Sequence, residues 1–253
     1  MVVAPAQKMR VISWNLLHGV QIPPVKNQEW QKSLVTAAGV VAKNYQPDFI
    51  GLQEVDYLQP RSGGINQTKV IAEELGLKHW AYLPSLIGTP GERWHKVEDL
   101  EKALITEKSK QVSKEKSYGI GIATNVAIKK LYLKSLGRSW VGMPLLIPGE
   151  DAKGVKFIYV KDEPRIALIA ELENGVTIAN THLSFVPGVN VFQLNRLSSF
   201  MKDLPGDELL IGFSRTPLTN FDTDFYIYRT ETPTSSFATF ERSLNRYAPA
   251  GQP

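Results

Sequence analysis

The sequence predicts an α/β domain in which apolar strands alternate with amphipathic helices and hairpins. Two patterns predict it: short apolar runs typical of buried strands recur along the chain, and apolar residues repeat at three- and four-residue spacing between them. The length of 253 residues is sufficient for one large domain, or at most two small ones, with a sizeable core. Because no stretch has the composition of a linker, we expect a single domain over residues 1–253.

The composition excludes several classes of protein. The 43% hydrophobic and 21% charged residues are typical of a soluble globular chain, and no apolar run is long enough to span a bilayer. The N-terminus does not have the pattern of a secretory signal, so we expect a cytoplasmic protein. The absence of cysteine excludes disulfides and thiolate chemistry. The net charge of +4 does not select a partner.

The first third of the chain has alternating strand and helix patterns. A strand in MRVISWNLL should end at Asn15, and the apolar spacing in 28–45 predicts an amphipathic helix. DFIGLQEV follows as a buried strand, and Asn66 is expected to cap a helix over 67–76.

The rest of the chain is predominantly strand-like. YGIGIATN and VAIKKLYLKSL are predicted to be successive strands of a sheet, as are RIALIAELE and GVTIANTHL. Residues 91–117 are charged and poorly periodic, which predicts an exposed insertion that is mobile or partly helical. A helix is expected over Val189–Met201, and the tail over 247–253 should be irregular.

Polar residues with catalytic potential stand where three of these strands end. Asn15 closes the strand in SWNLLHG, Glu54 closes PDFIGLQEVD, and His182 closes IANTHLS. Each alone is more often structural, but all three at strand ends favour a shared site. A carboxylate beside an amide oxygen suits Mg²⁺, and a histidine can bond a phosphoryl oxygen or move a proton. His18 either faces the same cleft or has a structural role.

Four motifs together resemble the endonuclease/exonuclease/phosphatase superfamily, the DNase I-like metal-dependent phosphohydrolases. They are SWNLLHG, PDFIGLQEVD, DEPR and NTHLSF, in this order, and the resemblance covers residues 9–215 well and the remainder weakly. The resemblance implies an α/β (α+β) four-layer sandwich of two packed, mostly antiparallel sheets flanked by helices. It also implies hydrolysis of phosphodiesters or phosphomonoesters.

The resemblance also assigns roles by position. Glu54 and Asn15 correspond to the metal-site residues of the family, which implies Mg²⁺ or Mn²⁺ as cofactor. His182, Asn15 and Arg165 of DEPR are the implied catalytic residues. Arg165, His182 and Tyr118 of SYGIG are the implied substrate-binding residues.

The sequence departs from the family pattern in its C-terminal part. ELLIG predicts a strand ending at Gly212, where family members continue with Gly-Asp-x-Asn, but this chain continues with a loop FSRTP that has no Asp. Asn245 and Arg246 stand where the family has Leu-Asp-His or Leu-Asp-Tyr, and the closing Ser-Asp-His strand has no counterpart. Asp222 and Asp224 are either replacement acids from a loop or solvated surface residues.

Two functions therefore stay open. The first is a Mg²⁺-dependent phosphodiesterase or phosphatase of nuclease-like type, weakened by loss of the catalytic Asp and His. The second is a catalytically inactive member that binds a phosphorylated ligand, a nucleic acid or a protein. A C-terminal truncation of an active protein is a further possibility. For the first two we expect a monomer whose ligand is a nucleic acid, a nucleotide or a phospholipid headgroup.

Overall fold

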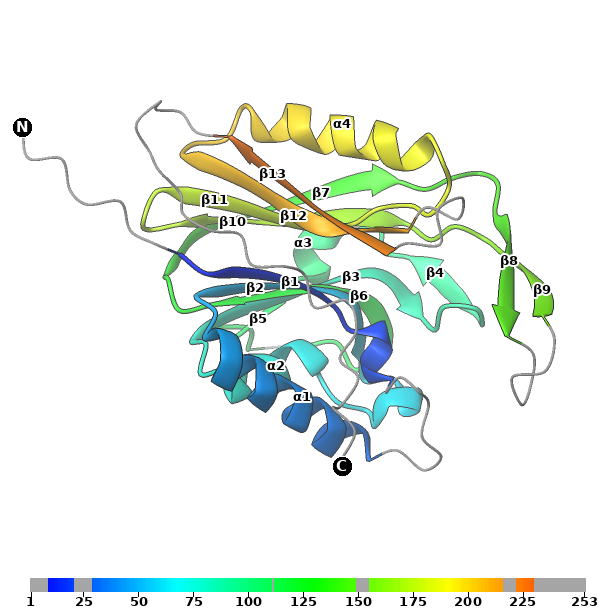
Figure 1. The fold of residues 1–253 in the computed structure, drawn as a ribbon, viewed down its shortest axis with the longest axis horizontal. Helices are drawn as coiled ribbons and strands as arrows, with labels where there is room; N and C mark the ends of the chain where they lie inside the picture. The colour runs from blue at the N-terminus through cyan, green and yellow to red at the C-terminus, as the bar shows by residue number, and fades with distance from the viewer. Residues whose placement is uncertain (1–8, 21–28, 111, 149–154, 216–221, 230–253) are drawn as a thin grey trace, which may run out of the picture.

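Two β-sheets face each other between two layers of helices (Figure 1). The computed structural model describes residues 9–20, 29–110, 112–148, 155–215 and 222–229. From top to bottom of Figure 1 the layers are α4, the second sheet, the first sheet, and α1 with α2. The predicted α/β four-layer sandwich is therefore confirmed.

The first sheet, sheet A, has the order β1-β2-β6-β3-β4, and β5 also pairs with β3. Only the β1–β2 pair in this sheet is parallel. Its strands are β1 (Val11–Asn15), β2 (Phe49–Tyr57), β3 (His79–Gly88), β4 (Trp94–Lys96), β5 (Ile105–Thr106) and β6 (Ser117–Thr124).

The second sheet, sheet B, has the order β13-β12-β11-β10-β7, with one parallel pair, β11–β12. A separate hairpin, β8–β9, projects at one end of the sandwich (Figure 1, right). The strands are β7 (Ile128–Gly137), β8 (Met143–Pro148), β9 (Val155–Val160), β10 (Arg165–Leu172), β11 (Val176–His182), β12 (Asp207–Arg215) and β13 (Asp222–Arg229).

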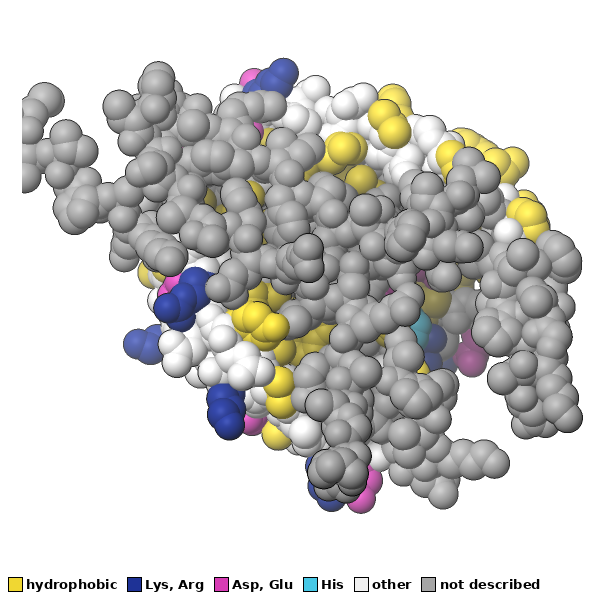
Figure 2. All heavy atoms as spheres, in the orientation of Figure 1, with side chains coloured by type: hydrophobic (Ala, Val, Ile, Leu, Met, Phe, Trp, Pro, Cys, Tyr) yellow, Lys and Arg dark blue, Asp and Glu magenta, His cyan; other side chains and the backbone are white. Residues whose placement is uncertain are grey.

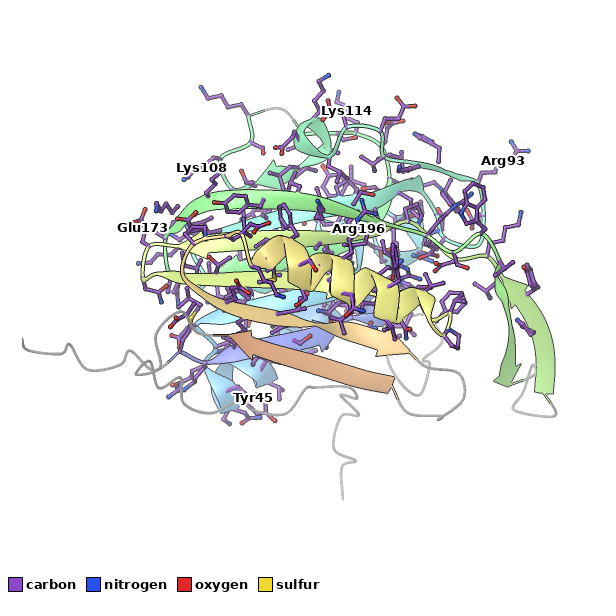
Figure 3. All side chains as sticks on the ribbon, turned by 90° about the horizontal axis from the view of Figure 1, so that it is seen from above. Tyr45, Arg93, Lys108, Lys114, Glu173 and Arg196 are labelled. Carbon is purple, nitrogen blue, oxygen red and sulfur yellow. The ribbon has the colours of Figure 1, made fainter. Side chains whose placement is uncertain are left out.

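Helices α1 and α2 cover the outer face of sheet A, and α4 covers that of sheet B. Figure 3 shows α4, which carries Arg196, lying across the strands of sheet B. Asn66 caps α2 as predicted, since its side chain accepts a bond from the Lys69 amide. The helical elements are α1 (Trp30–Tyr45), α2 (Gln67–Glu74), α3 (Leu100–Ala103), α4 (Val189–Met201) and the 3₁₀ turns η1 (Leu17–Gly19) and η2 (Pro60–Ser62).

Each space between neighbouring layers holds an apolar cluster. Successive side chains of β10 belong to two different clusters: Leu168 packs between the sheets, and Ile169 packs on the side of α4. The cluster between sheet A and its helices includes Leu52, Val55 and Ile71. The central strands are thus buried on both faces, which explains their nearly continuous apolar runs in the sequence.

A buried amide pair joins the two sheets beside the irregularity in β2 and near the end of β11. Gln53 donates to Asn180 at 2.6 Å, and the Asn180 amide donates to the carbonyls of Leu52 and Gly121 at 3.0 and 2.9 Å. These carbonyls lie where the β2–β6 register shifts, so Asn180 satisfies backbone acceptors next to the break. Gly51 permits the close approach, because a Cβ there would lie 2.9 Å from Asn180.

Two predictions about strand arrangement are wrong. β6 and β7 follow each other in the chain, but they belong to different sheets rather than to one. The strand predicted to end at Gly212 continues to Arg215, because β13 pairs with it along its length. Asp222 and Asp224 therefore belong to a strand and not to a loop.

The segment 91–117 is also more ordered than predicted. It is partly helical, as expected, through α3, but it also adds β4 and β5 to the edge of sheet A beside β3. Ile105 is buried, so this segment contributes to the core rather than standing apart from it. The predicted irregular tail, Asn245 and Arg246 lie outside the described residues.

Replacing Asn180 with leucine should lower the free energy of unfolding by about 3 kcal/mol. The change keeps the volume but leaves the Gln53 amide and two carbonyls buried without partners. Chemical denaturation measures the effect. Asn125→Leu, at an exposed turn, is the control and should change stability by less than about 0.5 kcal/mol. Equal stability of the two variants would show that the amide pair does not hold the sheets together.

Candidate active site

Three of the predicted site residues meet at one end of the sandwich. Asn15 ends β1, and His182 ends β11 in the opposite sheet. The prediction that Glu54 also ends its strand is wrong, because β2 continues past Glu54 to Tyr57. The Asn15 amide donates to Glu54 Oε1 at 2.9 Å, and His182 Nε2 lies 3.9 Å from the same oxygen. The predicted convergence of these residues is confirmed.

A bulge in β2 aims Glu54 toward this site. The register with β6 shifts between Leu52 and Val55, and both of these residues pack against the helix layer. Strict alternation from Leu52 would place Glu54 on that apolar face, and the extra residue removes it from there. Glu54 has a φ of +54°, a left-handed conformation that costs a non-glycine residue on the order of 1 kcal/mol.

The turn after β1 is strained in the same way. Leu17 and His18 have φ values of +47° and +57°. The Leu17 amide donates to the Asn15 side-chain oxygen at 3.0 Å, and Gln67 donates to the His18 carbonyl at 2.6 Å. Side-chain hydrogen bonds therefore hold this turn in a conformation that the backbone alone disfavours.

Two histidines flank the Glu54 carboxylate. His18 Nε2 lies 3.7 Å from Oε2, on the other side from His182. Burial lowers the pKa of His18, although Glu54 opposes the change, and burial with the charge of Arg165 holds the pKa of His182 well below its usual value. Both imidazoles are therefore neutral at pH 7. Buried Nδ1 of His18 has no hydrogen-bond partner within the described chain, which favours the tautomer that carries its proton on Nε2.

Arg165 and Tyr118 complete the predicted set. With His182 and Ser85 they line a small cavity between the sheets, and both side chains are buried. Tyr118 also faces His18, with ring centroids 5.5 Å apart. Burial, with the nearby charges of Glu54 and Glu163, raises the pKa of Tyr118 well above its usual value, so it remains a neutral hydroxyl group.

Two charged residues that the sequence analysis did not single out belong to the same region. Glu163 interacts electrostatically with Arg165, Glu54 and Arg61. Burial raises the pKa of Glu163 to about 7, so this carboxyl can hold or release a proton near neutral pH. Arg61 forms a two-pronged ion pair with buried Asp56, at 2.9 and 2.7 Å. Glu163 lies inside the DEPR motif, so its proximity to Arg165 could have been predicted from the sequence. No sequence motif predicted a role for Arg61.

The donor atoms fit only a lightly held divalent ion. In the described parts of the chain, no three His, Cys, Asp or Glu side chains are grouped closely enough to enclose a metal. Glu54 provides one carboxylate, and the Asn15 amide nitrogen faces it while the Asn15 oxygen accepts from Leu17. Mg²⁺ is often held by one or two carboxylates with several waters and a substrate phosphate, so one carboxylate is compatible with it.

Figure 2 shows a histidine beside basic and acidic side chains on the right of the view, near the end with the β8–β9 hairpin. They are set back from the front of the molecule.

Among the described residues, no helix has the length and apolar character needed to cross a membrane.

Several solved structures are similar to this fold. An endonuclease/exonuclease/phosphatase from Beutenbergia cavernae matches with 20% identity and a TM-score of 0.45, over 80% of this chain and 46% of its own. An endonuclease/exonuclease/phosphatase family protein from Bacteroides thetaiotaomicron has 16% identity and a TM-score of 0.46, and the match covers 81% of this chain and 63% of that protein. A mannosyl-6-phosphatase from the same organism has 14% identity and a TM-score of 0.44, and the match covers 81% of this chain and 64% of that protein.

The matched proteins are of the family that the sequence motifs resemble. The chain spans about half to two thirds of the length of these three structures. No protein-family model matches the chain, and no curated protein matches it. Identities of 20% or less and TM-scores below 0.5 are too low to carry a conclusion about activity or substrate.

Glu163 should make the stability of the protein fall as pH rises from about 4.5 to about 7. The folded protein binds this proton more tightly than the unfolded chain, whose ordinary value is 4.5, so deprotonation favours unfolding. Glu163→Gln removes the titration and should be more stable than the wild type at pH 8 by about 1–2 kcal/mol, allowing for partial exposure. Urea unfolding at pH 4.5, 6 and 8 measures this.

Glu173→Gln is the matched control. Glu173 is exposed at the end of the molecule opposite the hairpin (Figure 3), so its variant should follow the wild-type pH profile. If Glu163→Gln also follows the wild-type profile, the Glu163 carboxyl does not titrate in this range.

Proposed function

We propose that the protein is a metal-dependent phosphoric ester hydrolase with a low rate. One arrangement carries the proposal: the Glu54 carboxylate, at the bulge in β2 and held by Asn15, lies between two neutral imidazoles beside the cavity that Arg165 lines. A guanidinium and imidazole N–H groups are donors for phosphoryl oxygens. A hard carboxylate is the ligand for a divalent cation that accompanies phosphate.

Each residue has a distinct task in this proposal. Arg165 and His182 bind the phosphoryl oxygens, the first as a fixed cation and the second as a neutral donor. Asn15 and His18 orient the Glu54 carboxylate from its two sides. Tyr118 contacts the His18 ring and also lines the cavity, so it lies between the two. Glu54 would hold Mg²⁺ or Mn²⁺, which stabilises negative charge on a phosphoryl group when bound.

The low rate follows from the end of β12. Phe213 stands in register with His182 where the family that the motifs resemble places its Asp. The loss of a well-placed general base or acid costs on the order of 10²–10⁴ in rate. We therefore expect the rate to be lower by about this factor than that of a site with the Asp in place.

A binding protein without activity is the second candidate. The specific observation in its favour is that β12 runs on to Arg215 in register with β13, so the chain at 213–215 is strand rather than a catalytic loop. Such a protein would still hold a nucleic acid, a nucleotide or a phospholipid headgroup by its phosphate. Phosphate binding without turnover is the result that would select this candidate.

Turnover of bis(4-nitrophenyl) phosphate in the presence of Mg²⁺ or Mn²⁺ tests the proposal. We expect slow release of nitrophenol that falls at least about 10-fold in Glu54→Gln, because the variant loses the anionic ligand. Glu73→Gln, an exposed glutamate on α2, should leave the rate unchanged. A wild-type rate equal to background, or to that of Glu54→Gln, contradicts hydrolysis at this site.

Phe213→Asp should raise the rate. The change places a carboxylate at the register position beside His182, where it can orient or deprotonate water. We expect a gain on the order of 10–10³-fold, which disappears when Glu54→Gln is added. Phe213→Asn is the control, since its amide is of similar size but is not a base. A gain of the same size with asparagine would exclude acid–base catalysis as the cause.

A further inference from the structure

Asp162, just before β10, is a buried acceptor for donors from three separate segments. Its Oδ1 accepts from Arg165 Nε and Nη2 at 3.3 and 3.0 Å. Its Oδ2 accepts from the Ser139 amide at 2.7 Å and from the Ser184 hydroxyl at 2.8 Å. The side chain has no exposed area, so all four bonds form away from water.

These contacts fix the orientation of Arg165. Two of its three guanidinium nitrogens bind one carboxylate, and the guanidinium lies 5.9 Å from the ring centre of Phe185. The side chain is only 5% exposed, which leaves little room for other rotamers. Nη1 is the nitrogen that Asp162 does not engage, and Arg165 lines the cavity that it shares with His182.

The same carboxylate reaches the segment that follows His182. Ser184 lies two residues after His182. Its backbone amide is fixed, because it donates to the Gln193 side chain of α4 at 2.8 Å. The Ser184 hydroxyl then accepts from the Val186 amide at 3.1 Å. Asp162 thus links the start of β10, which carries Arg165, to the end of β11, which carries His182.

We propose that Asp162 is a positioning residue that holds Arg165 at a fixed place beside His182, so that both donors meet the same phosphate. This inference rests on the proposed function for its ligand. Its structural content, that Asp162 determines where the Arg165 guanidinium lies, is independent of turnover.

A purely stabilising ion pair would not require this arrangement. Replacing a buried ion pair by apolar residues of similar volume is often neutral or stabilising, so such a pair is weak support for a stabilising role. The Asp162–Arg165 pair instead fixes direction: two bonds to one guanidinium define its plane, and two further bonds anchor the carboxylate to neighbouring segments. Both features serve a residue whose remaining nitrogen must meet a ligand.

Titration with inorganic phosphate in the presence of Mg²⁺, measured by calorimetry, tests the inference. Arg165→Lys and Asp162→Asn should each weaken binding about 10–100-fold, the effect expected for a charge-assisted bond. Asp162→Asn added to Arg165→Lys should cause little further loss, because Asp162 acts through Arg165. Glu171→Gln is the matched control: it removes an ion-paired carboxylate at the far end of the same strand and should leave binding unchanged.

Nuclear magnetic resonance gives a readout that does not need a ligand. The Arg165 Nε–H should appear as a slowly exchanging signal, assigned by its loss in Arg165→Lys. It should be lost or exchange faster in Asp162→Asn and persist in Glu171→Gln. If Asp162→Asn does not fold, Ser184→Ala removes one bond to the carboxylate without changing charge, and should shift the same signal and weaken phosphate binding by about 2–5-fold.

The results separate the inference from the proposed function. Wild-type protein that binds no phosphate overturns the proposed function, and the Arg165 signal then decides the positioning by itself. An Arg165 signal unchanged in Asp162→Asn overturns the inference. So does a full additional loss of phosphate affinity when Asp162→Asn is combined with Arg165→Lys.

Discussion

The site depends on one buried contact, the hydrogen bonds of the Asn180 amide across the space between the sheets. Asn180 belongs to sheet B, but it satisfies two backbone carbonyls of sheet A next to the bulge in β2, and it accepts from Gln53. Without those partners the break in the ladder would leave buried acceptors unpaired. Because Asn180 lies two residues before His182, the bond that supports the bulge also sets the distance between His182 and Glu54.

Backbone strain is concentrated at the same end of the sandwich. Three of the non-glycine residues with positive φ belong to the site: Glu54 carries its carboxylate, His18 lies 3.7 Å from that carboxylate, and Leu17 donates to Asn15. Such conformations persist only where hydrogen bonds over-determine them, and here the Asn15 and Gln67 side chains bind the strained turn. The strain gives the site its geometry: it turns Glu54 off the apolar face of β2 and brings His18 to its second oxygen.

Charge is paired for the two arginines near the site but not for Glu54, which lies between two neutral imidazoles. Arg165 is held by Asp162 and Arg61 by Asp56, so each guanidinium already has a buried counter-ion. Burial keeps the two histidines neutral and holds Glu163 partly protonated near pH 7. A dianionic phosphate accompanied by a divalent cation adds no large net charge to such a region, whereas either ion alone would. This charge distribution is compatible with both catalysis and binding. The two candidate functions differ in whether the residues at the end of β12 provide a catalytic group.

The sequence by itself determined the strands β1, β2, β6, β7, β10, β11 and most of β12, the main helices, and the convergence of Asn15, Glu54 and His182. It could do so because apolar alternation and strand-end polarity are local signals, and because the four motifs carry the order of the fold. It did not reveal that β6 and β7 enter different sheets, that β13 extends β12, or that β4 and β5 join the edge of sheet A. Strand pairing is a long-range choice that local pattern does not encode. The DEPR motif places Asp162 and Glu163 near Arg165 in the chain, but their burial, like that of Arg61, was decided by the tertiary structure. Burial and neighbouring charge exist only once distant segments pack together.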